Sequence, residues 1–337
     1  MLVVSWVAIV PLFGAQPPSG SAARVEAADD NGTAFATGRG DLIAPRYGAS
    51  ATSDGRWVYV YGGAPSGSRN GPDFMHPGLH SSIERIDPTS LESTYFSNGL
   101  HRRANHASVL IAGALVSCGG RTQVGLTRAR VSSCETLDFE SGIFRELPAL
   151  PEALRTLGMA ELDGVLYAIG GLTNPRGFSK STFRLRQGSE SAWERLAELP
   201  VPRQGEIVAV AGKLWAIGGY NGSAMRSVLV FNPGTGRWEQ REDLPYALSA
   251  FSAVADGDSI YLFGDYEQMS AVHRYTTPTG RFERLELEIT PRRHSAAVVI
   301  AGRALVIGGN QQSSGPATTL IEAFELEDLR SAAARKE

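Results

Sequence analysis

The sequence lacks several features that mark common functional classes. Its 337 residues carry a net charge of −3, so there is no basic excess to attract nucleic acid. No uninterrupted apolar run reaches the roughly 18 residues that a membrane-spanning helix needs. The motifs GxSxG, GxxxxGK[ST] and HExxH are also missing. We therefore expect no nucleic-acid partner, no membrane span in the mature chain, no metal and no other cofactor.

Cysteine is scarce, with only Cys118 and Cys134. Cys118 ends one apolar, strand-like run, and Cys134 begins the next. Opposed residues on neighbouring antiparallel strands come within bridging distance. We predict a disulfide between them, with two buried free thiols as the alternative.

The N-terminal segment is apolar and uncharged from Leu2 to Phe13, and small and polar residues follow it. This order is typical of a secretory signal, although no Lys or Arg precedes the apolar run and the first basic residue is Arg24. We expect a signal-like segment over residues 1–30 and a secreted or periplasmic protein. An apolar N-terminal strand is the alternative.

Glycine, in contrast, is abundant at 38 residues, and much of it lies in a repeat. Short apolar runs end in Gly-Gly five times and in Gly-Asp once, at intervals of 44 to 57 residues. Such self-similarity indicates a repeat architecture. The six pairs are Gly62-Gly63, Gly119-Gly120, Gly170-Gly171, Gly218-Gly219, Gly264-Asp265 and Gly308-Gly309.

Each unit carries the signals of four short strands. In one unit these are "EIVAV", "LWAIGG", "SVLVFN" and "RWEQR", with "AGK" and "PGTG" at turns. We predict an all-β fold over residues 31–327: a six-bladed β-propeller of four-stranded antiparallel blades, followed by a charged tail at 328–337. An aromatic residue recurs in the fourth strand, at Phe144, Trp193, Trp238 and Phe282.

The last unit lacks a fourth strand of its own. The segment Gly32 to Gly38 precedes the first unit and has Phe35 where the recurring aromatic would fall. We predict that this N-terminal strand completes the last blade, because pairing the two ends removes an open sheet edge. After Leu326 we expect a helical or frayed tail.

The Gly-Gly strand ends, the aromatic seven positions after a third-strand residue and the "PR" before the next unit resemble the kelch repeat, from about Thr33 to Leu326. The resemblance implies a kelch-type propeller, a fold that hosts many activities. Secreted bacterial kelch-like proteins include the N-acetylneuraminate mutarotases. Galactose oxidase is another relative, but its copper site needs a histidine pair that has no evident match here.

One face of the predicted propeller gathers the Gly-Gly ends and the loops that lead into each unit. An arginine lies 15 or 16 residues before five of the pairs. Guanidinium groups bind carboxylates through two parallel hydrogen bonds. The pattern predicts a ring of ligand-binding arginines; pairing with loop carboxylates or backbone carbonyls between blades is the alternative. The arginines are Arg46, Arg103, Arg155, Arg203 and Arg293, with Arg292 competing for the last place.

The fifth unit departs from this pattern twice, since it lacks the arginine and has Asp265 for the second glycine. Asp265 and Glu267 are therefore candidate catalytic groups. Alternatively, Asp265 occupies a turn that needs a positive φ, which Asp tolerates.

Four of the six histidines lie close together in the sequence: His76, His80, His101 and His106. They do not show the spacing of a known metal motif. We expect loop or channel histidines rather than a metal site.

The function that these features favour is binding by a monomeric kelch-type propeller, through loops on one face. The expected partner is an anionic small molecule, a carbohydrate or a protein at the mouth. The alternative is a sugar mutarotase or epimerase acting on an acidic sugar, which needs a positioned acid, a base and a cationic clamp.

Overall fold

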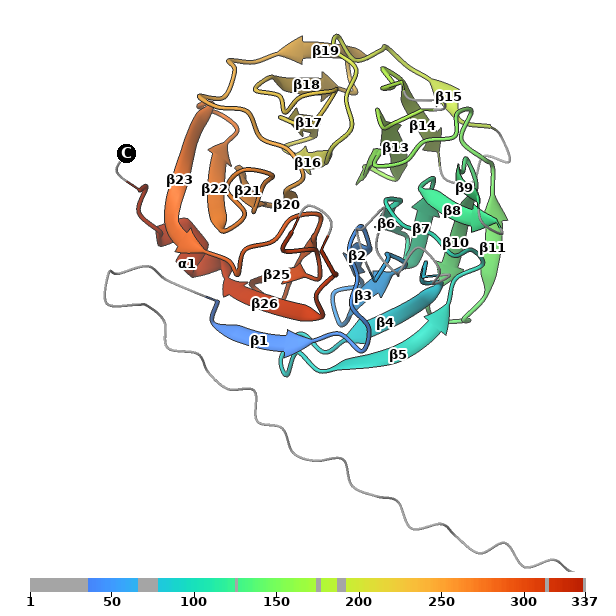
Figure 1. Cartoon of the computed structure of the whole chain (residues 1–337). Helices are drawn as coiled ribbons and strands as arrows, with labels where there is room; N and C mark the ends of the chain where they lie inside the picture. The colour runs from blue at the N-terminus through green and yellow to red at the C-terminus, as the bar shows by residue number, and fades with distance from the viewer. Residues whose placement is uncertain are drawn as a thin grey trace, which may run out of the picture.

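The computed structural model describes residues 36–65, 78–124, 127–173, 177–186, 192–312 and 315–335. Six four-stranded antiparallel sheets surround a central axis (Figure 1). The predicted six-bladed β-propeller is confirmed. We number the blades in chain order and name their strands A to D from the axis outward.

Blades one to five each use four strands in chain order. Blade six takes its outermost strand from the N-terminal side of the chain. Blade one is β2 (Ser50–Ser53), β3 (Val58–Tyr61), β4 (Ser82–Ile86) and β5 (Ser93–Asn98). Blade two is β6 (Ala107–Ile111), β7 (Ala114–Cys118), β10 (Cys134–Asp138) and β11 (Phe144–Leu147), with the hairpin β8 (Arg121–Val124) and β9 (Thr127–Arg130) between its B and C strands. Blade three is β12 (Gly158–Leu162), β13 (Val165–Ile169), β14 (Thr182–Arg186) and β15 (Glu194–Arg195).

The remaining blades have the same form. Blade four is β16 (Val208–Val210), β17 (Lys213–Ile217), β18 (Val228–Asn232) and β19 (Arg237–Gln240). Blade five is β20 (Ser252–Asp256), β21 (Ser259–Phe263), β22 (Ala271–Thr276) and β23 (Arg281–Glu288). Blade six is β24 (Ala296–Ile300), β25 (Arg303–Ile307), β26 (Leu320–Glu325) and β1 (Gly38–Asp41).

The B strands read as continuous apolar runs because both of their faces are buried. All four residues of β3 and all five of β13 are buried. A strand covered on both faces shows no polar alternation. The core consequently lies between neighbouring blades.

The seven-residue spacing of the repeat has a simple origin in strand register. Each of three third-strand residues lies directly opposite the aromatic of its fourth strand. Such cross-strand pairs are the units that stabilise a sheet. The pairs are Leu137 with Phe144, Phe231 with Trp238, and Tyr275 with Phe282.

Closure of blade six by an N-terminal strand is confirmed. The closing strand is β1, Gly38–Asp41, which lies outside β26 (Figure 1). Of the predicted segment 32–38, residues 32–35, with Phe35, lie outside the described residues, and Thr37 donates its N–H to the Ala323 carbonyl at 2.8 Å. A Cβ on Gly40 would lie 2.5 Å from the Leu91 carbonyl oxygen, so β1 can lie this close to blade one only with glycine there.

The predicted helical end is also present, as α1 (Leu326–Ser331). Leu326 and Leu329 are buried against blades five and six. The Arg330 guanidinium lies 2.6 Å from Asp256, and that of Arg335 lies 3.1 Å from Glu288. The charged tail is thus docked on blade five. No helix among the described residues is long and apolar enough to cross a membrane.

The Gly-Gly pairs hold each blade against the next. A Cβ on the first glycine of any of the six pairs would lie 2.3–2.7 Å from a carbonyl oxygen of the following blade. Real Cβ atoms do not come so close, so only glycine fits there. The second glycine donates its N–H to the same loop in five pairs. These bonds are Gly63 to Arg103, Gly120 to Leu154, Gly171 to Arg203, Gly219 to Leu248, and Gly309 to Arg46, at 2.7–2.9 Å.

Blade five contains a buried histidine on its C strand. The His273 ring is fully buried and stacks on Phe282 at 5.1 Å, and neither ring nitrogen has a hydrogen-bond partner in the described structure. Burial, with a smaller effect of nearby Arg284, lowers the pKa of His273 to about 4. At the same place in blade four the residue is Leu229.

We therefore predict that His273→Leu flattens the pH dependence of stability. Between pH 6.5 and pH 4 this histidine is mostly protonated in the unfolded chain and mostly neutral in the folded chain. Protonation therefore favours the unfolded state, and the stability of the wild type falls as the pH drops through this range. The lowered pKa of His273 corresponds to about 2–3 kcal/mol over this range. Urea unfolding at pH 7.5 and pH 4.5 measures this loss. Equal losses in wild type and variant would contradict the assignment.

Candidate functional site

The loops that enter the A strands form a ring around the axis. In every blade one residue of this loop, two or three positions before strand A, has a positive φ, including non-glycine residues for which that conformation is unfavourable. Backbone hydrogen bonds of 2.6–3.3 Å join successive loops: Gly48 to His294, Asn105 to Gly48, Thr156 to Asn105, Gly205 to Thr156, and His294 to Ala250.

The ring is interrupted between blades four and five. Among the described residues, no backbone hydrogen bond joins Ala250 to Gly205. Gly205 also differs from the other ring residues, with a φ of +153° where theirs are +52° to +64°. Glycine allows this departure because it has no Cβ.

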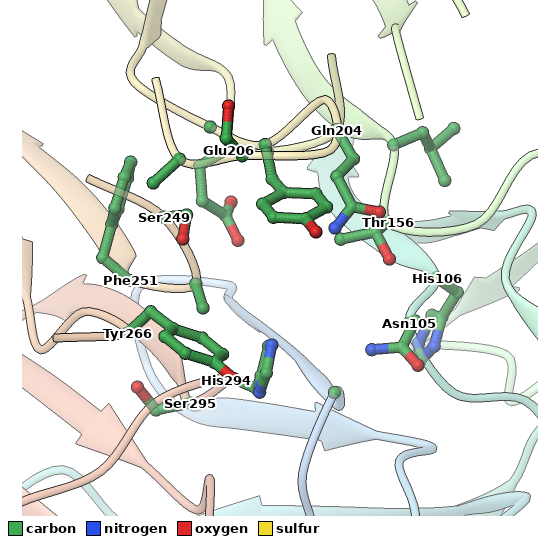
Figure 2. Close-up of a pocket in the computed structure, with 18 of the residues that line it drawn as sticks. Asn105, His106, Thr156, Gln204, Glu206, Ser249, Phe251, Tyr266, His294 and Ser295 are labelled. Carbon is green, nitrogen blue, oxygen red and sulfur yellow. The ribbon is translucent and has the colours of Figure 1, made fainter. Parts of the chain in front are cut away.

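A cavity of about 450 Å³ lies along the axis at this ring. All six blades contribute to its wall, mainly through the ring loops and the loops after strand B (Figure 2). Amide and hydroxyl groups dominate the polar lining. They come from Asn105, Thr156, Gln204, Ser249 and Ser295. A concave site with convergent polar groups is the usual form of a small-molecule site.

Glu206 is the distinctive group of this cavity. Its side chain projects into the opening from blade four (Figure 2) and is accessible to solvent there. The cavity walls around the carboxyl partly desolvate it, which raises the pKa of Glu206 to about 7. The other blades place Ala49, His106, Leu157, Phe251 and Ser295 at this position.

His294 lies at the same cavity from blade six (Figure 2). Its Nδ1 is 3.2 Å from Asn310 Oδ1, and the Asn310 amide nitrogen donates to the Gln312 carbonyl. Because the amide orientation is thereby fixed, Nδ1 carries the proton and Nε2 is an acceptor. Burial lowers the pKa of His294, so the ring is neutral at pH 7.

His106 is a second neutral imidazole in the wall. Its Nε2 lies 2.8 Å from Ser50 Oγ, and burial lowers its pKa well below the ordinary value. His80 and His101 lie elsewhere, and His76 lies outside the described residues. Within the described ranges, no group of three His, Cys, Asp or Glu side chains could hold a metal ion.

The two sequence candidates from blade five lie beside each other in different environments. Glu267 lines the cavity, and Asp265 is buried behind it. Asp265 does not have a positive φ, so the turn interpretation that required one is wrong. Desolvation raises the pKa of the Asp265 carboxyl.

Four arginines lie inside the blades instead of on the cavity wall. Arg46 and Arg103 are buried and form ion pairs of 2.8 and 3.0 Å with Glu84 and Glu135 on the C strands of their own blades. Arg292, the alternative to Arg293, pairs with Glu322 at 2.7 Å. These contacts resemble the alternative in which the arginines pair with carboxylates, but the carboxylates lie on C strands of the same blade and not in loops between blades.

Arg203 occupies the same position without a carboxylate. Its guanidinium donates to the Gly218 carbonyl at 2.8 Å and to the Ser227 hydroxyl at 2.7 Å. Burial lowers the pKa of Arg203 to about 10, so it remains charged at pH 7.

Arg155 and Arg293 belong to a different structural position, one residue later in the loop. Each forms a backbone bridge, with Leu172 and Asn310 respectively. The Arg293 guanidinium lies 3.9 Å from the centroid of the Tyr266 ring. The sequence pattern combined two positions because it accepted arginines 15 or 16 residues before Gly-Gly, and both positions fall within that range. Ligand binding by the five predicted arginines stays a prediction.

Glu206 was missed by the sequence analysis. Its only signal is a charged residue at a position where the other five units carry uncharged ones, directly after the ring glycine. In the sequence alone, a solvent-exposed surface glutamate explains this exception equally well, because only the structure shows that the ring of loops surrounds Glu206.

The predicted disulfide is confirmed. Cys118 and Cys134 lie directly opposite each other on β7 and β10 and are bonded. The signal-like segment lies outside the described residues, so secretion or a periplasmic location stays a prediction.

We predict that Arg103→Leu and Arg203→Leu destabilise the fold to different extents. Removing Arg103 leaves Glu135 buried without its cation, which should cost about 3–5 kcal/mol. Removing Arg203 leaves no buried carboxylate unpaired and should cost about 1–3 kcal/mol of stability. Chemical denaturation of both variants gives the comparison, and equal losses would show that the ion pair adds nothing to the arginine's hydrogen bonds. Blade three, with Leu154 at this position, shows that an aliphatic residue can be accommodated.

Comparison with known proteins agrees with the repeat geometry. The family model described as "Kelch motif" matches residues 204–245. Kelch-like protein 35 of Mus musculus is 26% identical over 186 residues, 54% of this chain and 31% of that protein. Kelch-like protein 33 of Homo sapiens is 35% identical over 125 residues, 35% of this chain and 23% of that protein. Beta-scruin of Limulus polyphemus is 20% identical and covers 68% of this chain and 27% of its own length.

The matched part therefore spans about a quarter to a third of the length of these relatives. A solved structure of the protein YjhT superimposes with a TM-score of 0.72 at 14% identity, covering 88% of this chain and 99% of that one. At that identity the likeness shows the fold alone. The repeats, the matched motif and these relatives together show that the chain is a six-bladed β-propeller that carries a kelch motif and is similar to kelch-repeat proteins.

Proposed function

We propose that the protein binds a small hydroxylated molecule in the axial cavity, through the loops that enter the A strands and those that follow the B strands. The observation that carries this proposal is Glu206, a carboxyl group with a pKa near 7 that faces the cavity and has no ion-pair or hydrogen-bond partner among the described residues. A titrating, unpaired group at a concave site is a functional-site signal.

The rest of the lining suits the same class of ligand. Amides of Asn105 and Gln204 can donate and accept, and the hydroxyls of Thr156 and Ser249 can do both as well. Tyr220 and Tyr266 are partly exposed at the wall and offer ring faces to an apolar edge of a ligand. A volume of about 450 Å³ fits a small molecule. A protein partner could insert only a side chain or a short loop.

A second candidate is proton transfer on a cyclic sugar. Ring opening requires a base that takes the proton of the anomeric hydroxyl and an acid that protonates the ring oxygen as its bond to carbon breaks. Glu206 can give or take a proton near pH 7, and His294 Nε2 is a proton acceptor on the same cavity. In this reading the polar lining holds the sugar and Glu206 exchanges the proton.

The test is titration calorimetry with neutral sugars, uronic acids and small carboxylates at pH 6 and pH 8. Between these values the Glu206 carboxyl changes from mostly neutral to mostly ionised, because its pKa is about 7. Affinity for a neutral sugar should rise with pH, since an ionised carboxylate accepts stronger hydrogen bonds. Affinity for an acidic sugar should fall because of charge repulsion. Glu206→Gln should weaken binding at least tenfold and remove the pH dependence.

The matched control is Glu239→Gln, which makes the same change on the exposed outer strand β19 of the same blade and should leave binding unchanged. Absence of binding by any compound, or equal affinity in wild type and Glu206→Gln, would contradict the proposal. For the second candidate, polarimetry of a bound sugar should show mutarotation slowed at least a hundredfold by Glu206→Gln, the lower range for loss of a general acid or base.

A further inference from the structure

Directly after strand B, the backbone of blade five has a different conformation from that of the other five blades. Its first glycine is kept, with Gly264 at a φ of +63°. The second position holds Asp265, which does not have a positive φ, whereas the five second glycines lie between +91° and +102°. The backbone conformation at the second position of the pair in blade five therefore differs from that in the other five blades.

The Asp265 side chain directs the loop that follows. The residue is 1% exposed, and its Oδ1 accepts the backbone N–H groups of Glu267 at 2.6 Å and Gln268 at 2.7 Å. When an Asp side-chain oxygen accepts the backbone N–H groups two and three residues later, the side chain stabilises a turn at that place. The other oxygen, Oδ2, is buried without a hydrogen-bond partner in the described structure.

This turn brings two side chains to the cavity. The Tyr266 N–H donates to the Ser249 carbonyl at 2.9 Å, and Arg293 of blade six lies over the Tyr266 ring. Tyr266 and Glu267 both line the cavity, and Figure 2 shows the Tyr266 ring directed into the opening.

The other blades hold the same stretch with one more backbone hydrogen bond. There the residue after the second glycine exchanges two backbone hydrogen bonds with the loop that enters strand A. Blade five has only one of the two within the described chain, from the Tyr266 N–H to the Ser249 carbonyl. The pairs in the other blades are Tyr47–Ala64, Ala104–Arg121, Arg155–Leu172, Gln204–Tyr220 and Arg293–Asn310.

We propose that Asp265 is a positioning residue, which holds Tyr266 and Glu267 as a wall of the cavity and thereby sets ligand specificity. This inference rests on the proposed binding function. The wall adds the Glu267 carboxylate to a cavity that already contains Glu206. Two carboxylates on neighbouring blades favour hydroxyl donors and repel anions, so the wall selects a neutral ligand over its acidic counterpart.

The first test needs no ligand. Asp265→Gly restores the residue of the repeat, and glycine accepts any φ, so the variant should fold. Hydrogen exchange at the amides of Glu267 and Gln268 should accelerate at least tenfold in it. Asp138→Gly is the matched control, because Asp138 accepts the N–H groups of Glu140 and Ser141 in the same way, in a turn on the opposite face of the propeller. Unchanged exchange in Asp265→Gly would overturn the positioning role.

The second test uses D-glucose and D-glucuronate, which differ only in an alcohol and a carboxylate at one carbon. We expect wild type to prefer glucose, and Asp265→Gly to move the affinity ratio towards glucuronate at least threefold. Glu267→Gln should move the ratio in the same direction. Adding Asp265→Gly to Glu267→Gln should then change the ratio little, because Asp265 acts through Glu267.

The outcomes separate the two proposals. Binding of neither sugar by wild type would contradict the specificity role and count against the proposed function. Binding that is lost in Glu206→Gln but has the same sugar ratio in wild type, Asp265→Gly and Asp138→Gly would leave the proposed function intact and overturn the specificity role. A fully additive double variant would show that Asp265 does not act through Glu267.

Discussion

The contact between a Gly-Gly pair and the next blade is the constraint on which the rest of the structure depends. At this point the end of strand B meets a carbonyl of the following loop so closely that a Cβ on the first glycine has no room. In five blades the second glycine adds a hydrogen bond of 2.7–2.9 Å. Because the contact fixes where each loop begins, it also fixes the ring of positive-φ residues around the axis and the width of the cavity.

Regular packing makes the exceptions informative, since a repeat constrains every blade to the same backbone. Blade four places Glu206 in the opening and its ring glycine at an unusual φ, and blade five replaces a glycine by Asp265. The interruption of the hydrogen-bond ring lies between these same two blades. The buried ion pairs of the loop arginines lie in blades one, two and six, whereas Arg203 of blade four is buried without a carboxylate partner.

The fold could be predicted from the sequence because its signals repeat. Strand register followed from the spacing of Phe231 and Trp238, and the disulfide from the places of its two cysteines in one unit. The site could not be predicted in the same way. Arg103 and Arg293 look alike by their distance from Gly-Gly, yet one residue of offset buries the first in an ion pair and sets the second over Tyr266. Glu206 acquires its raised pKa only from the protein that closes around the axis, which no local pattern encodes.

The most direct test of this account is the pKa of Glu206 itself. A carbon-13 NMR titration of protein labelled at the glutamate side-chain carboxyl, with the resonance assigned by its loss in Glu206→Gln, would measure the value in solution. The account predicts a midpoint about two to three units above the ordinary glutamate range, near 7. A midpoint near 4 to 4.5, typical of solvated glutamates, would contradict it, because the carboxyl would then lie in ordinary solvent and the cavity would lose its central group.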